Sequence, residues 1–155
     1  MDSHQLREII QRDPRMKSVF EGVFARNRVP VMVEKNEDRA YIINMDDVDE
    51  PGSHWVLAYF RRREGLYFDS FGKPPESHVY DWLKRNASEV IINDRTVQSD
   101  RSRYCGLFVI YVLYYLCRDV NLGQIVNRFV IRDLMLNDYM LMKWLYKHFQ
   151  TIKFL

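Results

Sequence analysis

The fold is best derived from residues 54–71, HWVLAYFRRREGLYFDSF. Two apolar runs rich in aromatic residues flank the charged RRREG, a pattern typical of a β-hairpin. If Arg62 and Arg63 form a two-residue loop, Asp69 lies opposite Val56, and His54 is a diagonal neighbour of Asp69 on the same face. Such neighbours are about 7–8 Å apart at Cα, within reach of a hydrogen bond. A loop with an odd number of residues would place them on opposite faces.

The elements around this hairpin predict an α+β protein. Further strands are expected at residues 29–33, 40–44 and 89–93, with the acidic run 45–53 as a loop. Helices are expected between Ser3, as the N-cap, and Pro14, and at residues 16–26, 76–85, 105–118, 122–136 and 138–149. We therefore expect residues 1–155 to form one domain, with a central mixed or antiparallel sheet and helices at both ends of the chain.

Composition limits the classes of partner. The chain has 155 residues, 47% of them hydrophobic, and a formal charge of only +2, which indicates no strong polyanion partner and leaves a weak DNA contact open. The longest apolar run, Tyr104–Cys117, is shorter than the about 20 residues that a bilayer requires, so we expect a buried helix and no membrane contact. No secretory signal is recognisable at the N-terminus, which favours an intracellular, reducing compartment.

Cys105 is the candidate nucleophile. With Ser102 as N-cap it occupies the first turn of a helix, where the dipole and free N–H groups favour a thiolate. Gly106 would let a substrate backbone approach closely. A lone cysteine in an apolar run is more often a small buried hydrophobe. The predicted neighbours change this balance, because a carboxylate from Asp69 on one imidazole nitrogen of His54 leaves the other nitrogen to meet the thiol.

Gln98 precedes Cys105 by seven residues in a polar loop. Its amide is a neutral donor that could stabilise the oxyanion of a tetrahedral intermediate together with the Cys105 N–H. Alone, Gln98 would be an ordinary loop residue. The two cysteines, Cys105 and Cys117, are not a disulfide pair, because on one helix they would lie roughly 18 Å apart, whereas a disulfide requires Cα atoms within about 7 Å.

The ordered motifs GSHW (52–55), YFDSFG (67–72), TVQ (96–98) and YCGLF (104–108) resemble the adenovirus maturation protease, or adenain-like, family of viral cysteine peptidases. The resemblance covers roughly residues 42–115. It implies a papain-like fold of the adenovirus-protease type, with Cys105 as nucleophile, His54 as base, Asp69 as its orienting group and Gln98 in the oxyanion hole. Trp55 would pack beside the imidazole and shape a narrow substrate groove.

The resemblance also implies substrates and a setting. It suggests cleavage of capsid or core precursors next to small residues such as glycine during virion maturation, in the host nucleus or cytoplasm and in the packaged virion. Adenovirus proteases are activated by a peptide held through an upstream cysteine, and this chain has no cysteine before Cys105. An activating peptide or DNA would therefore bind without a disulfide tether. A small DNA virus, a virophage or a Maverick-type transposon could encode such a compact version, and a monomer is the default.

Two alternatives stay open. More distant relatives of the same fold process SUMO-like modifiers and also use an Asp as third member, which makes a deubiquitinase or deSUMOylase the alternative enzyme. A non-catalytic capsid- or DNA-binding module is the alternative from another class. Arg61–Arg63 is either a solvated turn or a docking patch. No Cys/His spacing suggests a metal site, and no cofactor is expected.

Overall fold

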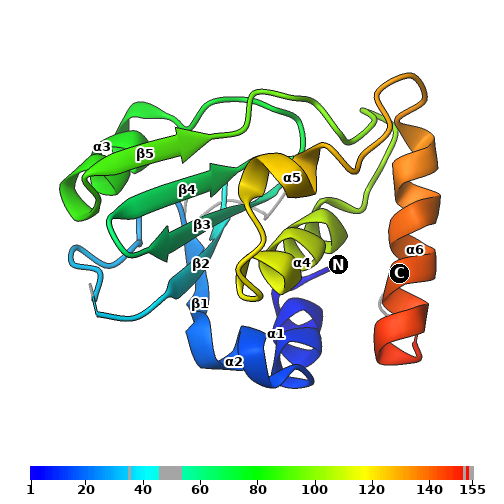
Figure 1. The fold of residues 1–155 in the computed structure, drawn as a ribbon, viewed down its shortest axis with the longest axis horizontal. Coiled ribbons are helices and arrows are strands. Elements are labelled where there is room, and N and C mark those ends of the chain that lie inside the picture. Colours follow the sequence, from blue (N-terminus) through cyan, green and yellow to red (C-terminus); the bar gives the residue numbers. More distant parts are fainter. Residues whose placement is uncertain (35, 46–53, 152, 154–155) are drawn as a thin grey trace.

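The computed structural model describes the chain except for residues 35, 46–53, 152 and 154–155 (Figure 1). A sheet in the order β1-β2-β3-β4-β5 forms the centre of the described part. The strands are β1 (Phe20–Ala25), β2 (Arg39–Asn44), β3 (Trp55–Arg61), β4 (Glu64–Phe68) and β5 (Glu89–Ile92). The helices are α1 (Ser3–Gln11), α2 (Pro14–Val19), α3 (Ser77–Asn86), α4 (Cys105–Leu116), α5 (Leu122–Val126) and α6 (Met135–Phe149).

The sheet is mixed. Strands β2, β3 and β4 pair antiparallel, whereas β1 pairs parallel with β2 at one edge and β5 pairs parallel with β4 at the other. Helix α3 connects β4 to β5, as a parallel pair requires a crossover. The predicted α+β class with a central mixed sheet is confirmed. The predicted loop at 45–53 lies, from residue 46 onward, outside the described residues.

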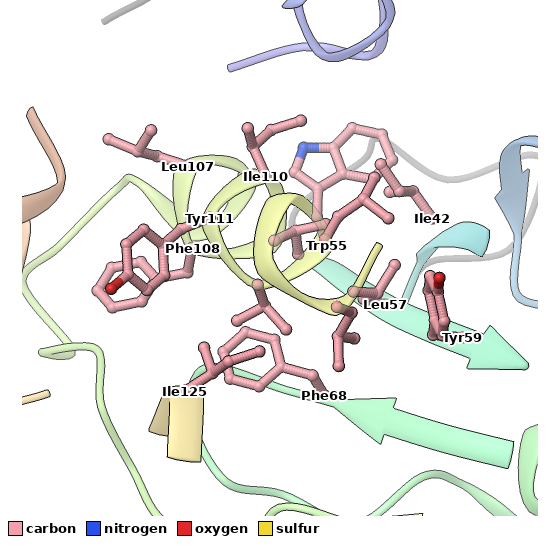
Figure 2. Packing of buried hydrophobic residues seen from close by; sticks show 14 of the residues in the cluster. Ile42, Trp55, Leu57, Tyr59, Phe68, Leu107, Phe108, Ile110, Tyr111 and Ile125 are labelled. Atoms are coloured by element: carbon pink, nitrogen blue, oxygen red, sulfur yellow. The ribbon is translucent and has the colours of Figure 1, made fainter. Parts of the chain in front are cut away.

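Helices cover both faces of the sheet. Helix α4 packs against one face together with α1 and α5, and α3 covers the other (Figure 1). Alternate residues of β3 divide between these two layers. Trp55, Leu57 and Tyr59 face α4 (Figure 2), while Val56, Ala58 and Phe60 face α3. Helix α4 is buried around nearly its whole circumference, which explains its continuous apolar sequence. This burial fixes the N-terminal end of α4 relative to β3.

Residues 16–26 do not form the predicted single helix. Helix α2 ends at Val19, and Phe20–Ala25 becomes β1, the parallel edge strand beside β2. Apolar residues in this segment are spaced in a way that suits a helix or an irregular strand, and the open edge of β2 supplies main-chain partners for the strand. The N-cap of α1 is Asp2, not Ser3; its carboxylate accepts the Gln5 N–H at 2.8 Å.

The strand predicted at residues 29–33 is also absent. Side chains of α3, rather than a neighbouring strand, bond its main chain. Trp82 donates from Nε1 to the carbonyl of Pro30 at 2.6 Å, and Asn86 Oδ1 accepts the N–H of Val33 at 2.9 Å. These bonds satisfy main-chain groups that a strand would place in a ladder.

The helix predicted over residues 122–136 is much shorter. Helix α5 ends at Val126 and α6 begins at Met135. Asn137 hydrogen-bonds the main chain of Val130, which lies between the two helices. Its Oδ1 accepts the N–H of Val130 and its Nδ2 donates to the Val130 carbonyl, both at 2.8 Å. A side chain thus replaces the helical hydrogen bonds that the periodicity of the sequence had suggested.

Candidate active site

His54 and Asp69 lie at the same end of the β3–β4 hairpin, one residue outside each strand. The register pairs Leu57 with Phe68 and leaves residues 62–63 as the loop, so the predicted pairing is confirmed. Nε2 of His54 lies 2.7 Å from Oδ1 of Asp69. The hairpin alone therefore brings the imidazole and the carboxylate into contact.

Hydrogen bonds other than the one to the imidazole also hold Asp69 in place. Its Oδ1 also accepts the N–H of Phe71 at 2.8 Å. Asn93, just after β5, binds both main-chain groups of Asp69: its Oδ1 accepts the Asp69 N–H and its Nδ2 donates to the Asp69 carbonyl, both at 2.9 Å. Sequence reasoning missed this role of Asn93, because an asparagine at the end of a strand carries no spacing signal that connects it to Asp69.

Gly72 closes the turn after Asp69. Its N–H donates to the Asp69 carbonyl at 2.8 Å, and its φ of +70° lies in the left-handed region. A Cβ at this position would lie 2.8 Å from the main-chain carbon of Arg95 and from the nitrogen of Thr96. Only glycine fits here without moving the loop that leads to Gln98.

Cys105 is the first residue of α4, and Tyr104 is the N-cap. The predicted N-cap at Ser102, with Cys105 two positions further into the helix, is therefore wrong. The Ser102 hydroxyl instead accepts the N–H of Tyr104 at 3.2 Å, which turns the chain just before the helix starts. At the first helical position Cys105 still lies at the positive end of the dipole, and its N–H has no intrahelical acceptor.

The thiol and the imidazole shift one another's acidity. Burial raises the pKa of Cys105. The hydrogen bond and charge of His54 and the N–H groups of Trp55 and Gly106 lower it by more than burial raises it, so the net shift is downward. Burial lowers the pKa of His54, yet the hydrogen bonds and charges of Asp69 and Cys105 outweigh it and raise that pKa to about 9. Because Asp69 engages Nε2, Nδ1 remains for the sulfur. The two pKa shifts together favour an imidazolium–thiolate pair.

The aromatic neighbour of the imidazole is Phe71, whose ring centroid lies 4.8 Å from that of His54. Trp55, which was predicted beside the imidazole, instead lies in the layer under α4 and donates from Nε1 to the carbonyl of Met1 at 3.0 Å (Figure 2). Adjacent residues of a strand point to opposite faces, which explains why His54 and Trp55 separate. A contact of Trp55 with substrate remains a prediction.

Gly106 has a packing reason to be glycine. A Cβ there would lie 3.2 Å from side-chain carbons of Leu6 and Met1 and 3.3 Å from the Met1 sulfur. The N-terminal segment and α1 therefore occupy the space that the missing side chain leaves. Close approach of a substrate backbone to Gly106 remains a prediction.

Gln98 is buried, with 1% of its surface exposed. Its Oε1 accepts the hydroxyl of Ser70 at 2.5 Å, and its Nε2 donates towards the carbonyl and hydroxyl oxygens of Ser102 at 3.2 and 3.1 Å. To serve an oxyanion, one of its two amide hydrogens must be directed at the substrate rather than at Ser102. The oxyanion role of Gln98 remains a prediction.

A cleft of about 380 Å³ opens beside the imidazole. His54 and Asp69 line it together with apolar and charged side chains: Met45, Phe71, Pro74, Lys73 and the ion pair Arg26–Glu76. This cleft is large enough to receive a side chain of an extended peptide beside His54.

Cys117 differs from Cys105 in its environment. Both thiols are free, as predicted. The Cys117 thiol donates to the carbonyl of Tyr114 at 3.2 Å, and burial raises its pKa to about 11. Such a thiol is almost wholly protonated at neutral pH and is a poor nucleophile.

The arginines at the hairpin turn lie in two different environments. Arg61 donates to the carbonyl of Leu116 at the end of α4, so it is a structural contact. Arg62 and Arg63 are exposed and line a separate cleft of about 510 Å³ with Arg85. A docking or DNA-contact role for these side chains remains a prediction.

No group of three or more His, Cys, Asp or Glu side chains in the described part of the chain could hold a metal ion. None of the helices in the described part of the chain is long and apolar enough to cross a bilayer.

The sequence matches no protein-family model and no curated protein. Its structure resembles that of the ASFV pS273R protease, with a TM-score of 0.65 and 15% identity over 86% of this chain and 63% of that one. The Se-Met form of the same protease matches with a TM-score of 0.52 and 18% identity over 63% of this chain and 41% of that one. This chain thus spans less than two thirds of the length of these proteases.

At these identities the comparison establishes the fold. The chain has a mixed α+β cysteine protease fold of the ASFV pS273R type. The narrower assignment to the adenovirus branch remains a prediction.

Proposed function

We propose that this chain is a cysteine endopeptidase in which Cys105 is the nucleophile, His54 the general base and Asp69 the group that orients it. The observation that carries the proposal is the 2.7 Å contact between Asp69 and His54, combined with the electrostatic interaction of His54 with Cys105. Together they lower the pKa of the thiol and raise that of the imidazole. A fold shared with solved cysteine proteases supports it.

The chemistry follows from this arrangement. The Cys105 thiolate attacks the carbonyl carbon of the scissile peptide, and the carbonyl oxygen takes up the negative charge. His54 gives its Nδ1 proton to the leaving amine as the C–N bond breaks, which leaves a thioester on Cys105. A water molecule, deprotonated by His54, then attacks the thioester and releases the carboxylic acid. Asp69 orients the imidazole and stabilises the imidazolium.

Two donors are suited to the oxyanion. The N–H of Cys105 is free of intrahelical bonding at the first position of α4. The Gln98 amide is held by Ser70 and Ser102 in the loop that precedes this position. Donors that are already oriented before the reaction stabilise developing charge without a cost of reorganisation.

We propose structural precursors of a virus as substrates, cleaved next to small residues such as glycine. The resemblance of the four motifs to those of the adenovirus proteases supports this, as does the viral origin of the solved proteases with the same fold. A monomeric state, a reducing intracellular compartment, an activator bound without a disulfide and a weak DNA contact also remain predictions.

The test compares wild type, Cys105→Ala and Cys117→Ala on a fluorogenic peptide containing Gly-Gly and on ubiquitin-, SUMO- and NEDD-type substrates. Wild type and Cys117→Ala should cleave the peptide, and Cys105→Ala should not. Preferential turnover of a modifier substrate would favour the deubiquitinase or deSUMOylase alternative. Turnover of none of them would favour the non-catalytic binding module.

A further inference from the structure

Two neighbouring residues at the start of α6 hold both sides of the loop that carries Gln98. Asn137 donates from Nδ2 to the carbonyl of Val97 at 2.8 Å. Asp138 Oδ1 accepts a hydrogen bond from the Ser102 hydroxyl at 2.9 Å. The exposed fractions of Asn137 and Asp138 are 0% and 2%. The loop before Cys105 therefore takes its shape from a helix that comes after it in the chain.

The Ser102 hydroxyl is the centre of this network. A hydroxyl offers one donor and two acceptor sites, and all three are used. It donates to Asp138, and it accepts from the Gln98 Nε2 at 3.1 Å and from the Tyr104 N–H at 3.2 Å. Since Ser70 donates to Gln98 Oε1, the amide is fixed between two serines. Donation to Asp138 sets which way the Ser102 lone pairs point.

Asp138 keeps a carboxylate where packing alone does not require one. Its Oδ2 atom is buried and has no hydrogen-bond partner among the described residues. Burial raises the pKa of Asp138, although the hydrogen bond from Ser102 opposes the shift. A buried acceptor without a partner is unfavourable, and an alkyl group would avoid it. What the carboxylate supplies is an acceptor for Ser102.

We propose that Asp138 is a positioning residue for the oxyanion hole, which acts through Ser102 to orient the amide of Gln98. Because the Ser102 hydroxyl donates its hydrogen bond to Asp138, a lone pair of the hydroxyl oxygen is free to accept the Gln98 Nε2–H. The inference rests on the proposed cysteine peptidase function. It adds a residue that touches neither substrate nor reacting atoms and that no motif of the sequence indicated.

The first measurement is steady-state kinetics of single variants. Asp138→Ala removes the acceptor and should lower kcat about ten-fold with KM nearly unchanged, because the oxyanion exists only near the transition state. Asp138→Asn keeps an acceptor oxygen of the same shape and should retain most of the activity. Alkylation of Cys105 by iodoacetamide passes through no oxyanion and should proceed at the wild-type rate in both variants.

The second measurement is a double-mutant cycle with Gln98→Ala, which separates positioning from a general structural role. If Asp138 acts through Gln98, Asp138→Ala should cost activity in the wild-type background and almost none in Gln98→Ala. An equal loss in both backgrounds would overturn the inference. Should Asp138→Ala fail to fold, Ser102→Ala breaks the same relay and takes its place in the cycle.

The third measurement does not depend on activity. In protein labelled with ¹⁵N-glutamine, the side-chain amide signal of Gln98, assigned with Gln98→Ala, should shift in Asp138→Ala and stay near its wild-type position in Asp138→Asn. An unchanged signal in Asp138→Ala would overturn the inference. If wild type cleaves no peptide while the signal shifts as expected, the proposed function fails and the positioning of Gln98 by Asp138 stands.

Discussion

The carboxylate of Asp69 lies 2.7 Å from the imidazole of His54, and it is the more deeply buried of the two, with its side chain 4% exposed against 16%. The carboxylate thus has little water to solvate it. It accepts the N–H of Phe71, and Asn93 fixes the main chain of Asp69. A charged group in this position stabilises the protonated imidazole strongly.

This pair predicts the titration of His54. Its pKa in the folded protein is raised from the usual 6.5 to about 9. The stabilisation is therefore fully present below about pH 6.5 and is lost as pH rises through about 9. NMR titration of the imidazole, assigned with His54→Gln, should give a midpoint near 9 in wild type and a clearly lower one in Asp69→Asn. The same midpoint in both proteins would show that Asp69 does not hold the proton.

The interaction of His54 with Cys105 also predicts the reactivity of the nucleophile. In a Cys117→Ala background, alkylation of Cys105 should remain fast below neutral pH, because the pKa of its thiol is lowered. Adding His54→Ala should move the alkylation profile towards the ~8.5 of a free thiol. Cys105→Ala is the control, since Cys117, with a pKa of about 11, should react slowly at neutral pH. An identical profile with and without His54 would contradict the interaction.

Gly72 connects stability with the site. Gly72→Ala should lower the free energy of unfolding by about 2 kcal/mol or more, because a left-handed residue with a Cβ costs 1–2 kcal/mol and the new Cβ also meets the main chain of Arg95 and Thr96. Chemical denaturation measures the loss. Gly123→Ala, in α5, is the matched control and should change stability by less than about 1 kcal/mol. Equal effects at both glycines would argue against a strained turn after Asp69.

Gln98 predicts a loss of turnover without a loss of the thiolate. Gln98→Ala should lower kcat by ~10²–10³ with little change in KM, and iodoacetamide should still alkylate Cys105. Gln98→Glu should be more severe, because a carboxylate adds repulsion to the lost donor while it can still accept from Ser70. Turnover by Gln98→Ala within about a factor of three of wild type would reduce Gln98 to a loop residue.

The sequence predicts those features that local geometry determines. The contact between His54 and Asp69 could be derived because a two-residue loop fixes the register of the hairpin, and the observed pairing of Leu57 with Phe68 has that register. That a helix begins close to Cys105 follows from the change from polar to apolar residues, although its N-cap is Tyr104 and not Ser102. In both cases residues close in sequence decide the outcome.

Features that depend on distant side chains could not be predicted. Trp82 and Asn86 bind the main chain of residues 30–33, which removes the expected strand there. Asp138 reaches Ser102 from a helix that the sequence placed only approximately. Neither contact leaves a periodicity or a motif, because a hydrogen bond between distant residues imposes no spacing on the chain.

The central claim, that Cys105 carries the acyl group of a cleaved substrate, can be tested by intact-protein mass spectrometry of acid-quenched turnover mixtures. With a peptide ester as substrate, wild type should gain the mass of the acyl group, and proteolytic mapping should place it on Cys105. Cys117→Ala should behave as wild type, and Cys105→Ala should show neither the adduct nor turnover. Cleavage that persists in Cys105→Ala, or an adduct mapped to Cys117, would contradict the account.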